Sequence, residues 1–233
     1  MNNDIDQLLN TWRNQLATAT QNLLELQELP TYQRLSTTKL TGITATKITP
    51  ALATMNDLFQ YFDLLVQTVN KASQLRQQLP KFLASEQKID EIKQLLNGAS
   101  IELSVVKIPL AERQLLTVNN QVNTITPNQL LQIMIHAFSI ARDAILEVDA
   151  VWEKLDYVIF DMHEEVNCLQ KLATSLGQNN LTELNQTENH LKLLQQRIEE
   201  DPLGIKTELQ QQIYPLLKQT KAKLEQVWLK QEK

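Results

Sequence analysis

The side chains best suited to chemistry in this sequence are three histidines and one cysteine. His163-Glu164-Glu165 suggests a metal site, but a two-histidine zinc helix needs a second histidine four residues on, where Asn167 stands. The di-iron bundle pattern needs a glutamate three residues before each histidine, and neither His163 nor His190 has one. We therefore expect a solvated acidic face here, with no metal and no cofactor.

The other candidates for chemistry also favour structural roles. His136, within Ile135-His-Ala-Phe, is typical of a half-buried histidine in a helical bundle. Cys168 has no histidine one helical turn away, which predicts an unreactive thiol. The four glycines are isolated, so the sequence has no phosphate-binding glycine pattern. We predict a protein that is not an enzyme, with a ligand-binding or catalytic bundle around His136 and Arg142 as the weaker alternative.

The composition favours an all-α protein. Among 233 residues, 42% are hydrophobic, 5% are aromatic and only four are glycine, while leucine and glutamine, both good helix formers, are abundant. The formal net charge of −5 disfavours nucleic acid as a partner. The single cysteine cannot form an internal disulfide, the first residues do not resemble a signal peptide, and no apolar run approaches the ~18 residues of a membrane span. We therefore expect a cytoplasmic protein.

Residues 1–98 are predicted to form N-terminal helices, the first from Asp4 to Leu29. Its apolar residues alternate at spacings of three and four, which is the pattern of a coiled-coil seam, and Pro30 ends it. The seam consists of Ile5, Leu9, Trp12, Leu16, Ala19, Leu23 and Leu26. Such a seam closes within one chain or between two copies, so a homodimer is one arrangement that it allows.

A threonine-rich segment, residues 31–49, follows this helix and is predicted to be a linker with strand propensity. Thr49-Pro50 then predicts a helix start, and Pro80 limits that helix. A shorter helix is expected from Ser85 to Asn97, because Asn97-Gly98 is a typical helix stop.

Residues 99–125 are expected to form an extended connector followed by a short helix. Ile101, Leu103 and Val105 alternate with polar residues, as in a strand. A lone strand leaves backbone groups unpaired, so three explanations stay open. The segment 101–106 forms a two-stranded ribbon with 42–48, lies as a strap across the bundle, or is completed by a strand of another protein.

Residues 126–233 are predicted to form a long, coiled-coil-like helical hairpin. Thr126-Pro127-Asn128-Gln129 has the capping-box pattern that begins a helix, and the spacing of three and four then continues to Leu176. Gly177 supplies the turn, so residues 127–176 are expected to lie antiparallel to 180–230 in an elongated bundle. A second apolar row predicts that the first half of the long helix is buried on more than one side. That row is Ile133, Ala137, Ile140 and Ala144.

The returning arm is predicted to be jointed. Asp201-Pro202 can cap and restart a helix, and Pro215 removes a backbone donor. Lysines then give the C-terminal helix a mildly basic character.

These patterns predict a scaffold, an adaptor or a subunit of a larger assembly that binds an unidentified protein partner through apolar helix seams. The candidate interaction residues are Ile5, Leu9, Trp12, Leu16, Ile101, Leu103, Val105, Trp152 and Trp228. The alternative is a peripheral membrane-binding or membrane-remodelling protein. It would use the basic residues of segment 31–49 (Arg34, Lys39 and Lys47) or the C-terminal helix, where Trp228 suits an interface.

Overall fold

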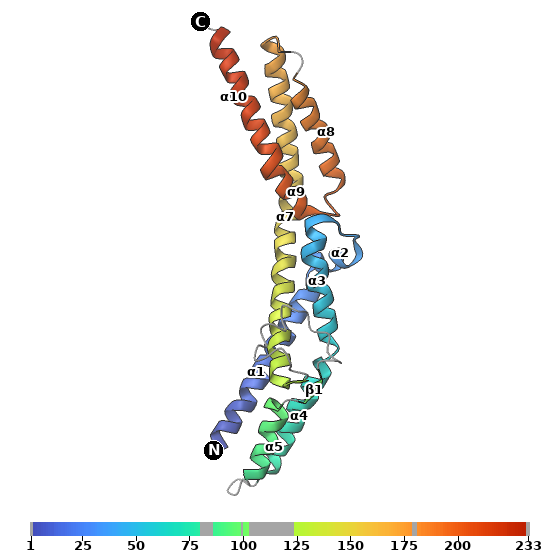
Figure 1. The fold of residues 1–233 in the computed structure, drawn as a ribbon, viewed down its shortest axis with the longest axis vertical. Coiled ribbons are helices and arrows are strands. Elements are labelled where there is room, and N and C mark those ends of the chain that lie inside the picture. The colour runs from blue at the N-terminus through green and yellow to red at the C-terminus, as the bar shows by residue number, and fades with distance from the viewer. Residues whose placement is uncertain (1, 80–85, 99, 103–123, 179–180, 232–233) are drawn as a thin grey trace. The chain divides into compact units, whose positions relative to one another are not determined.

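The computed structural model describes residues 2–79, 86–98, 100–102, 124–178 and 181–231 (Figure 1). Within them the fold is all-α with one two-stranded antiparallel ribbon, which confirms the predicted class. The elements are α1 (Asn2–Glu28), α2 (Pro30–Thr37), α3 (Gly42–Phe59), α4 (Phe62–Gln78), α5 (Glu86–Asn97), β1 (Ile101–Glu102), β2 (Thr124–Ile125), α7 (Pro127–Ser175), α8 (Thr182–Gln196), α9 (Pro202–Glu208), the π-helix η1 (Leu209–Ile213) and α10 (Tyr214–Gln231).

The chain divides into two compact units. Unit 1 comprises residues 1–32 and 50–144, and unit 2 comprises residues 33–49 and 145–233. The divisions fall inside α3 and α7. Both of these helices therefore contribute residues to both units.

In unit 1 the predicted seam of α1 is buried. Ile5, Leu9 and Trp12 are at most 3% exposed, and Leu16 is half-buried. Beside the seam, the Arg76 guanidinium in α4 donates to both carboxylate oxygens of Asp6, at 2.8 and 2.9 Å. The seam is therefore closed inside one chain.

The helix expected between Pro50 and Pro80 is divided in two. α3 ends at Phe59 and α4 begins at Phe62, with the Tyr61 N–H donating to the Leu58 carbonyl between them. Phe59, the last residue of α3, is 47% exposed. The next helix, α5, begins at Glu86 and ends at Asn97 as predicted, and it buries Ile89, Ile92 and Leu96.

The threonine-rich segment 31–49 is largely helical, so the prediction of a linker with strand propensity is wrong. Some of its hydroxyls bond to the preceding helical turn, as where Thr46 Oγ1 donates to the Gly42 carbonyl at 3.0 Å. α3 begins at Gly42, whose φ of +57° favours glycine. Pro50 lies inside α3 and does not begin it.

The ribbon forms with a different partner from the one predicted. Ile101 pairs with Ile125 and Glu102 with Thr124, whereas residues 42–48 belong to α3. The predicted pairing is wrong because residues 42–48 are helical, and the β-branched residues Thr124 and Ile125 form the partner strand instead. Leu103, Val105 and the short helix expected after Pro109 lie outside the described residues.

The start of α7 confirms the capping box. The Gln129 N–H donates to Thr126 Oγ1 at 3.0 Å, and the Thr126 N–H donates to Gln129 Oε1 at 2.9 Å. Of the second apolar row, Ile133, Ala137 and Ala144 are buried and Ile140 is 43% exposed. The first half of α7 is thus buried over a wide face, as predicted.

In unit 2, α8 runs antiparallel to α7. Gln170 Nε2 donates to Asn185 Oδ1 at 3.3 Å, and Trp152 Nε1 donates to the Ile198 carbonyl at 2.9 Å. Later positions in α8 therefore meet earlier positions in α7, which confirms the hairpin.

The return is shorter than predicted, because the chain reverses again. After α8 it turns through residues 197–201, and α10 then runs parallel to α7 (Figure 1). At the end of α10, Gln231 Nε2 donates to the Leu176 carbonyl at the end of α7, at 3.2 Å. The predicted joint at Asp201-Pro202 is therefore a reversal of direction, and unit 2 contains three long helical runs where two were expected.

Candidate functional site

Asp201 fixes the start of α9 in unit 2. The carboxylate is 2% exposed, and its Oδ1 accepts N–H bonds from Gly204 in α9, at 3.1 Å, and from Thr44 in α3, at 2.9 Å. The Leu203 N–H donates to Thr44 Oγ1 at 3.0 Å. One aspartate thus caps two helix N-termini, where the partial positive charge favours a carboxylate. Gly204 and Gly42 lie so close that a Cβ on either would overlap this carboxylate.

Trp152 fixes α7 beside the same turn. Its indole N–H donates to the Ile198 carbonyl, and the Arg34 guanidinium carbon lies 3.8 Å from the ring centroid. Arg34 also forms a bidentate ion pair with Glu199. This cation–π contact and ion pair connect α2, α7 and the turn after α8.

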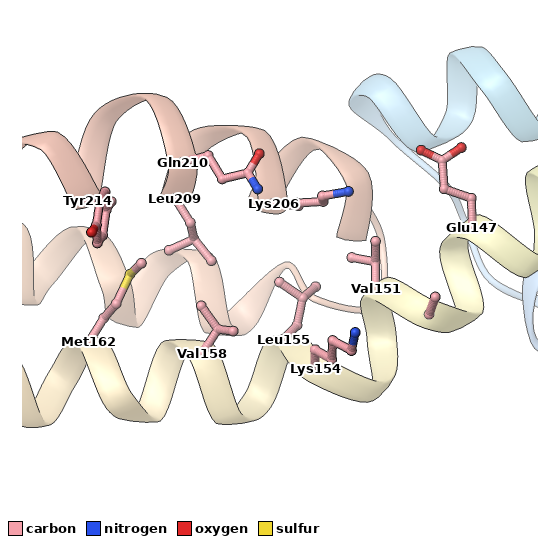
Figure 2. Close-up of a pocket in the computed structure, with 11 residues that line it drawn as sticks. Glu147, Val151, Lys154, Leu155, Val158, Met162, Lys206, Leu209, Gln210 and Tyr214 are labelled. Atoms are coloured by element: carbon pink, nitrogen blue, oxygen red, sulfur yellow. The ribbon is translucent and has the colours of Figure 1, made fainter.

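Between the parts of the chain that these residues position lies an apolar groove of about 440 Å³. Side chains of α7 form one wall, and side chains of α9, η1 and α10 form the other (Figure 2). The apolar lining is Ala150, Val151, Leu155, Val158, Met162, Leu209 and Tyr214, and the polar lining is Glu147, Lys154, Lys206 and Gln210. A volume of this size is typical of sites for small molecules.

The π-helix η1 lies in the second wall of the groove. The Tyr214 N–H bonds to the Leu209 carbonyl five residues earlier, and Leu209 and Gln210 line the groove. Pro215, which cannot donate a backbone hydrogen bond, follows directly. Single π-helical turns are rare in α-helical segments and frequently occur at functional sites.

The charges of the groove are gathered at one end. Lys154 and Lys206 lie at the Val151 end, whereas Met162 and Tyr214 lie at the other end (Figure 2). Glu147 forms an ion pair with Lys47 of α3, and this pair neutralises its charge. Within the described residues neither Lys154 nor Lys206 has an ion-pair or hydrogen-bond partner. This end of the groove therefore carries uncompensated positive charge in an acidic chain.

Large aromatic side chains are exposed on the same unit. Tyr157 and Phe160 of α7 are 74% and 63% exposed, and Tyr214 of α10 is 56% exposed. Tyr214 lines the groove, whereas Tyr157 and Phe160 lie outside its lining. Exposed aromatics close together on one helix are typical of binding surfaces rather than of ordinary solvated faces.

Two carboxylates with lowered pKa are not part of the groove lining. The hydrogen bond from Arg76 holds the pKa of Asp6 below its ordinary value, and the attraction of the same guanidinium adds to this effect. The pKa of Glu188 is lowered chiefly by hydrogen bonds from Lys192 and Gln170. Both lowered pKa values therefore result from contacts that hold helices together or lie within one helix.

The residues predicted to bind a partner are dispersed. Ile5, Leu9 and Trp12 are buried in unit 1, and Trp152 is buried in unit 2. Leu16 and Ile101 are half-buried, and Trp228 is 48% exposed near the end of α10. Leu103 and Val105 lie outside the described residues. Among those described, Trp228 is thus the predicted contact residue with the most exposed side chain.

The residues considered for chemistry do not converge. His136 is exposed and not half-buried as expected, and Arg142 contacts Asn22 and Asp143 at 3.3 to 3.4 Å. Cys168 is exposed. In the part of the chain that the structure describes, no three His, Cys, Asp or Glu side chains are grouped to hold a metal ion.

Lys154, Lys206, Tyr157 and Phe160 are not among the residues predicted from the sequence. Tyr157 and Phe160 stand outside the spacing of three and four that defines the seam of α7, and large apolar residues in such positions are a usable signal. The lysines gave no signal, because residues 154 and 206 come together only through the reversal at residues 197–201.

No protein-family model matches the chain, and no curated protein or solved structure is significantly similar to it. Among the described residues, no helix has both the length and the apolar character that crossing a membrane requires.

Proposed function

We propose that the protein is a non-enzymatic, cytoplasmic interaction protein, a scaffold or adaptor, that binds a protein partner through the exposed aromatic residues of unit 2. The observation that supports this proposal is the exposure of Tyr157 and Phe160 on one helix. Aromatic residues are enriched at the centres of protein interfaces, where a few of them provide most of the binding free energy.

The contact surface proposed here differs from the apolar seams favoured by the sequence. Most of the seam residues of α1 and α7 are buried, and a buried side chain cannot contact a partner unless the fold opens. Tyr157 and Phe160 need no rearrangement, because most of each side chain already contacts solvent. A rigid helix that presents aromatic side chains loses little conformational entropy on binding.

The test compares the tagged wild-type chain with the double variant Tyr157→Ser/Phe160→Ser. Partners that co-purify with the wild type are expected to be lost from the variant, and the purified partner should bind it at least tenfold more weakly. Phe59→Ser, which alters a 47% exposed aromatic residue of unit 1, is the matched control and should retain the partner. Equal partner recovery by the double variant would reject this surface.

A second candidate function, peripheral membrane binding, is favoured by one separate observation. Trp228 and Leu229 are 48% and 55% exposed, with exposed Lys221 and Lys230 on the same helix. Trp12 and Trp152 are buried, so a blue shift of tryptophan emission on adding anionic vesicles would report on Trp228. No flotation with such vesicles at low salt, and no shift, would reject this candidate.

A further inference from the structure

We propose that the groove between α7 and the α9–α10 segment binds a free, single-chain amphiphile with an anionic head group, of which a medium-chain fatty acid is the simplest example. This inference is independent of the partner surface, because Tyr157 and Phe160 do not line the groove. The class of ligand follows from the shape of the groove, from its lining and from the position of its charged residues.

The apolar part of the groove fits an alkyl chain. Leu155, Val158 and Met162 of α7 face Leu209 and Tyr214 across it (Figure 2). From Lys154 to Met162 the α-helix rises roughly 12 Å, which suits a chain of medium length lying along the groove. An aliphatic tail in this position removes apolar surface from water on both walls without leaving a polar group unpaired.

The charged end specifies the head group. The ammonium groups of Lys154 and Lys206 belong to opposite walls and have no partner within the described residues. A carboxylate at this end can accept hydrogen bonds from both, and such charge-assisted bonds are stronger than neutral ones. A cationic head group would be repelled here. The ion pair between Glu147 and Lys47 keeps the nearest carboxylate of the groove from cancelling this preference.

The π-helix is an independent feature of the same wall. A π-helical turn contains more residues than an α-helical turn, and η1 contributes Leu209 and Gln210 to the lining. In a regular α-helix every backbone N–H bonds to the carbonyl four residues earlier. The π-helical turn departs from this pattern at a cost in local stability, and it does so next to the groove. The feature is expected where the shape of a wall serves binding.

The test titrates the full chain, labelled with ¹³C at its methionine methyl groups, with decanoate below its aggregation concentration. Met162 lines the groove, whereas Met55 and Met134 are buried in unit 1 and serve as internal controls. We expect a saturable shift of the Met162 resonance and none at Met55 or Met134. Octanoate, two methylenes shorter, should bind about fifteenfold more weakly, since a buried methylene contributes roughly fourfold in affinity.

Two variants and two further probes complete the test. Lys154→Gln/Lys206→Gln should weaken decanoate binding at least about fivefold but leave binding of the uncharged decanol unchanged. Val158→Trp should fill the groove and abolish the Met162 shift, while Lys218→Gln/Lys221→Gln, outside the lining, should bind decanoate normally. Unchanged Met55 and Met134 resonances show that unit 1 of each variant is folded, and a urea-unfolding midpoint close to that of the wild type shows that unit 2 is folded.

Several results would overturn the proposal. They are an absence of saturation at Met162, equal affinity for decyltrimethylammonium and decanoate, or equal shifts at Met55, Met134 and Met162. A Met162 shift with anionic vesicles but none with free decanoate would assign the groove to a membrane surface and reject a free ligand. The two proposals can fail separately. Lys154→Gln/Lys206→Gln should lose decanoate binding and still capture the protein partner, whereas Tyr157→Ser/Phe160→Ser should lose the partner and still bind decanoate.

Discussion

Trp12 and Trp152 are both buried, but only Trp152 has an acceptor for its indole N–H within the described residues. Replacing each with phenylalanine removes the same volume. In Trp152→Phe, however, the Ile198 carbonyl also loses its hydrogen bond, and the contact with Arg34 weakens. We expect Trp152→Phe to lower the free energy of unfolding by about 1 to 2 kcal/mol more than Trp12→Phe, measured by urea denaturation. Equal losses would show that the bond contributes nothing.

Asp6 gives a pH dependence whose sign is fixed by the direction of its pKa shift. Arg76 lowers the pKa of Asp6 in the folded state, so the pair stabilises the fold above the unfolded pKa of about 3.9 and is lost as the pH falls through the lowered folded value. Asp6→Asn should therefore lower stability at pH 7, by less than about 1 kcal/mol for so exposed a pair, and reduce the further loss between neutral and acidic pH.

The matched control for this prediction is Asp63→Asn. Asp63 is an exposed carboxylate in the first turn of α4, and its replacement removes the same charge without removing the bond to Arg76. Urea denaturation at several pH values checks both variants. If Asp6→Asn keeps the acid dependence of the wild type, the bond to Arg76 is not its source.

At the scale of elements, Asp201 and Gly204 should be coupled. Gly204 has no positive φ, and the three atoms nearest to a Cβ there all belong to the Asp201 carboxylate. Gly204→Ala should therefore destabilise the wild-type chain by about 1 to 3 kcal/mol through overpacking. In the Asp201→Ala background the same change should be neutral, or stabilising by up to about 1 kcal/mol, because alanine favours helix over glycine.

A double-mutant cycle of thermal or urea unfolding measures this coupling. The expected result is a change of sign for Gly204→Ala between the two backgrounds. If its effect is the same in both, Asp201 does not determine the need for glycine at residue 204. Gly42→Ala is a poor substitute in this cycle, since its φ of +57° strains any other residue.

Elements specified by neighbouring residues could be predicted, and elements specified by distant ones could not. The capping box at Thr126 and Gln129 and the stop at Gly98 depend on residues three or four apart, and the structure has both. The helix at residues 42–49 depends on the bond between Thr44 and Asp201, which are 157 positions apart. Threonine favours strands in isolation, and here a tertiary contact outweighs that propensity.

The same distinction applies to the candidate site. The exposure of Tyr157 and Phe160 could be predicted from the sequence, because both residues lie outside the spacing of three and four that defines the apolar seam of α7. The groove was not visible, because the predicted hairpin paired residues 180–230 with α7 in one direction. The reversal at residues 197–201 instead places Lys206 and Leu209 beside Lys154 and Leu155. No local pattern distinguishes a jointed arm from two helices that reverse direction.

At the scale of the whole molecule, the burial of the seams leads to a prediction about oligomeric state. Ile5, Leu9 and Trp12 are at most 3% exposed in a single chain, so a coiled-coil dimer through this seam would require unit 1 to open. We expect sedimentation velocity to show a monomer of 26.8 kDa at micromolar concentration, with no dependence on concentration. A dimer that persists in Tyr157→Ser/Phe160→Ser would contradict this expectation and return the seams to consideration. A dimer that this variant dissociates would instead identify a second copy of the chain as a partner of the exposed aromatic residues.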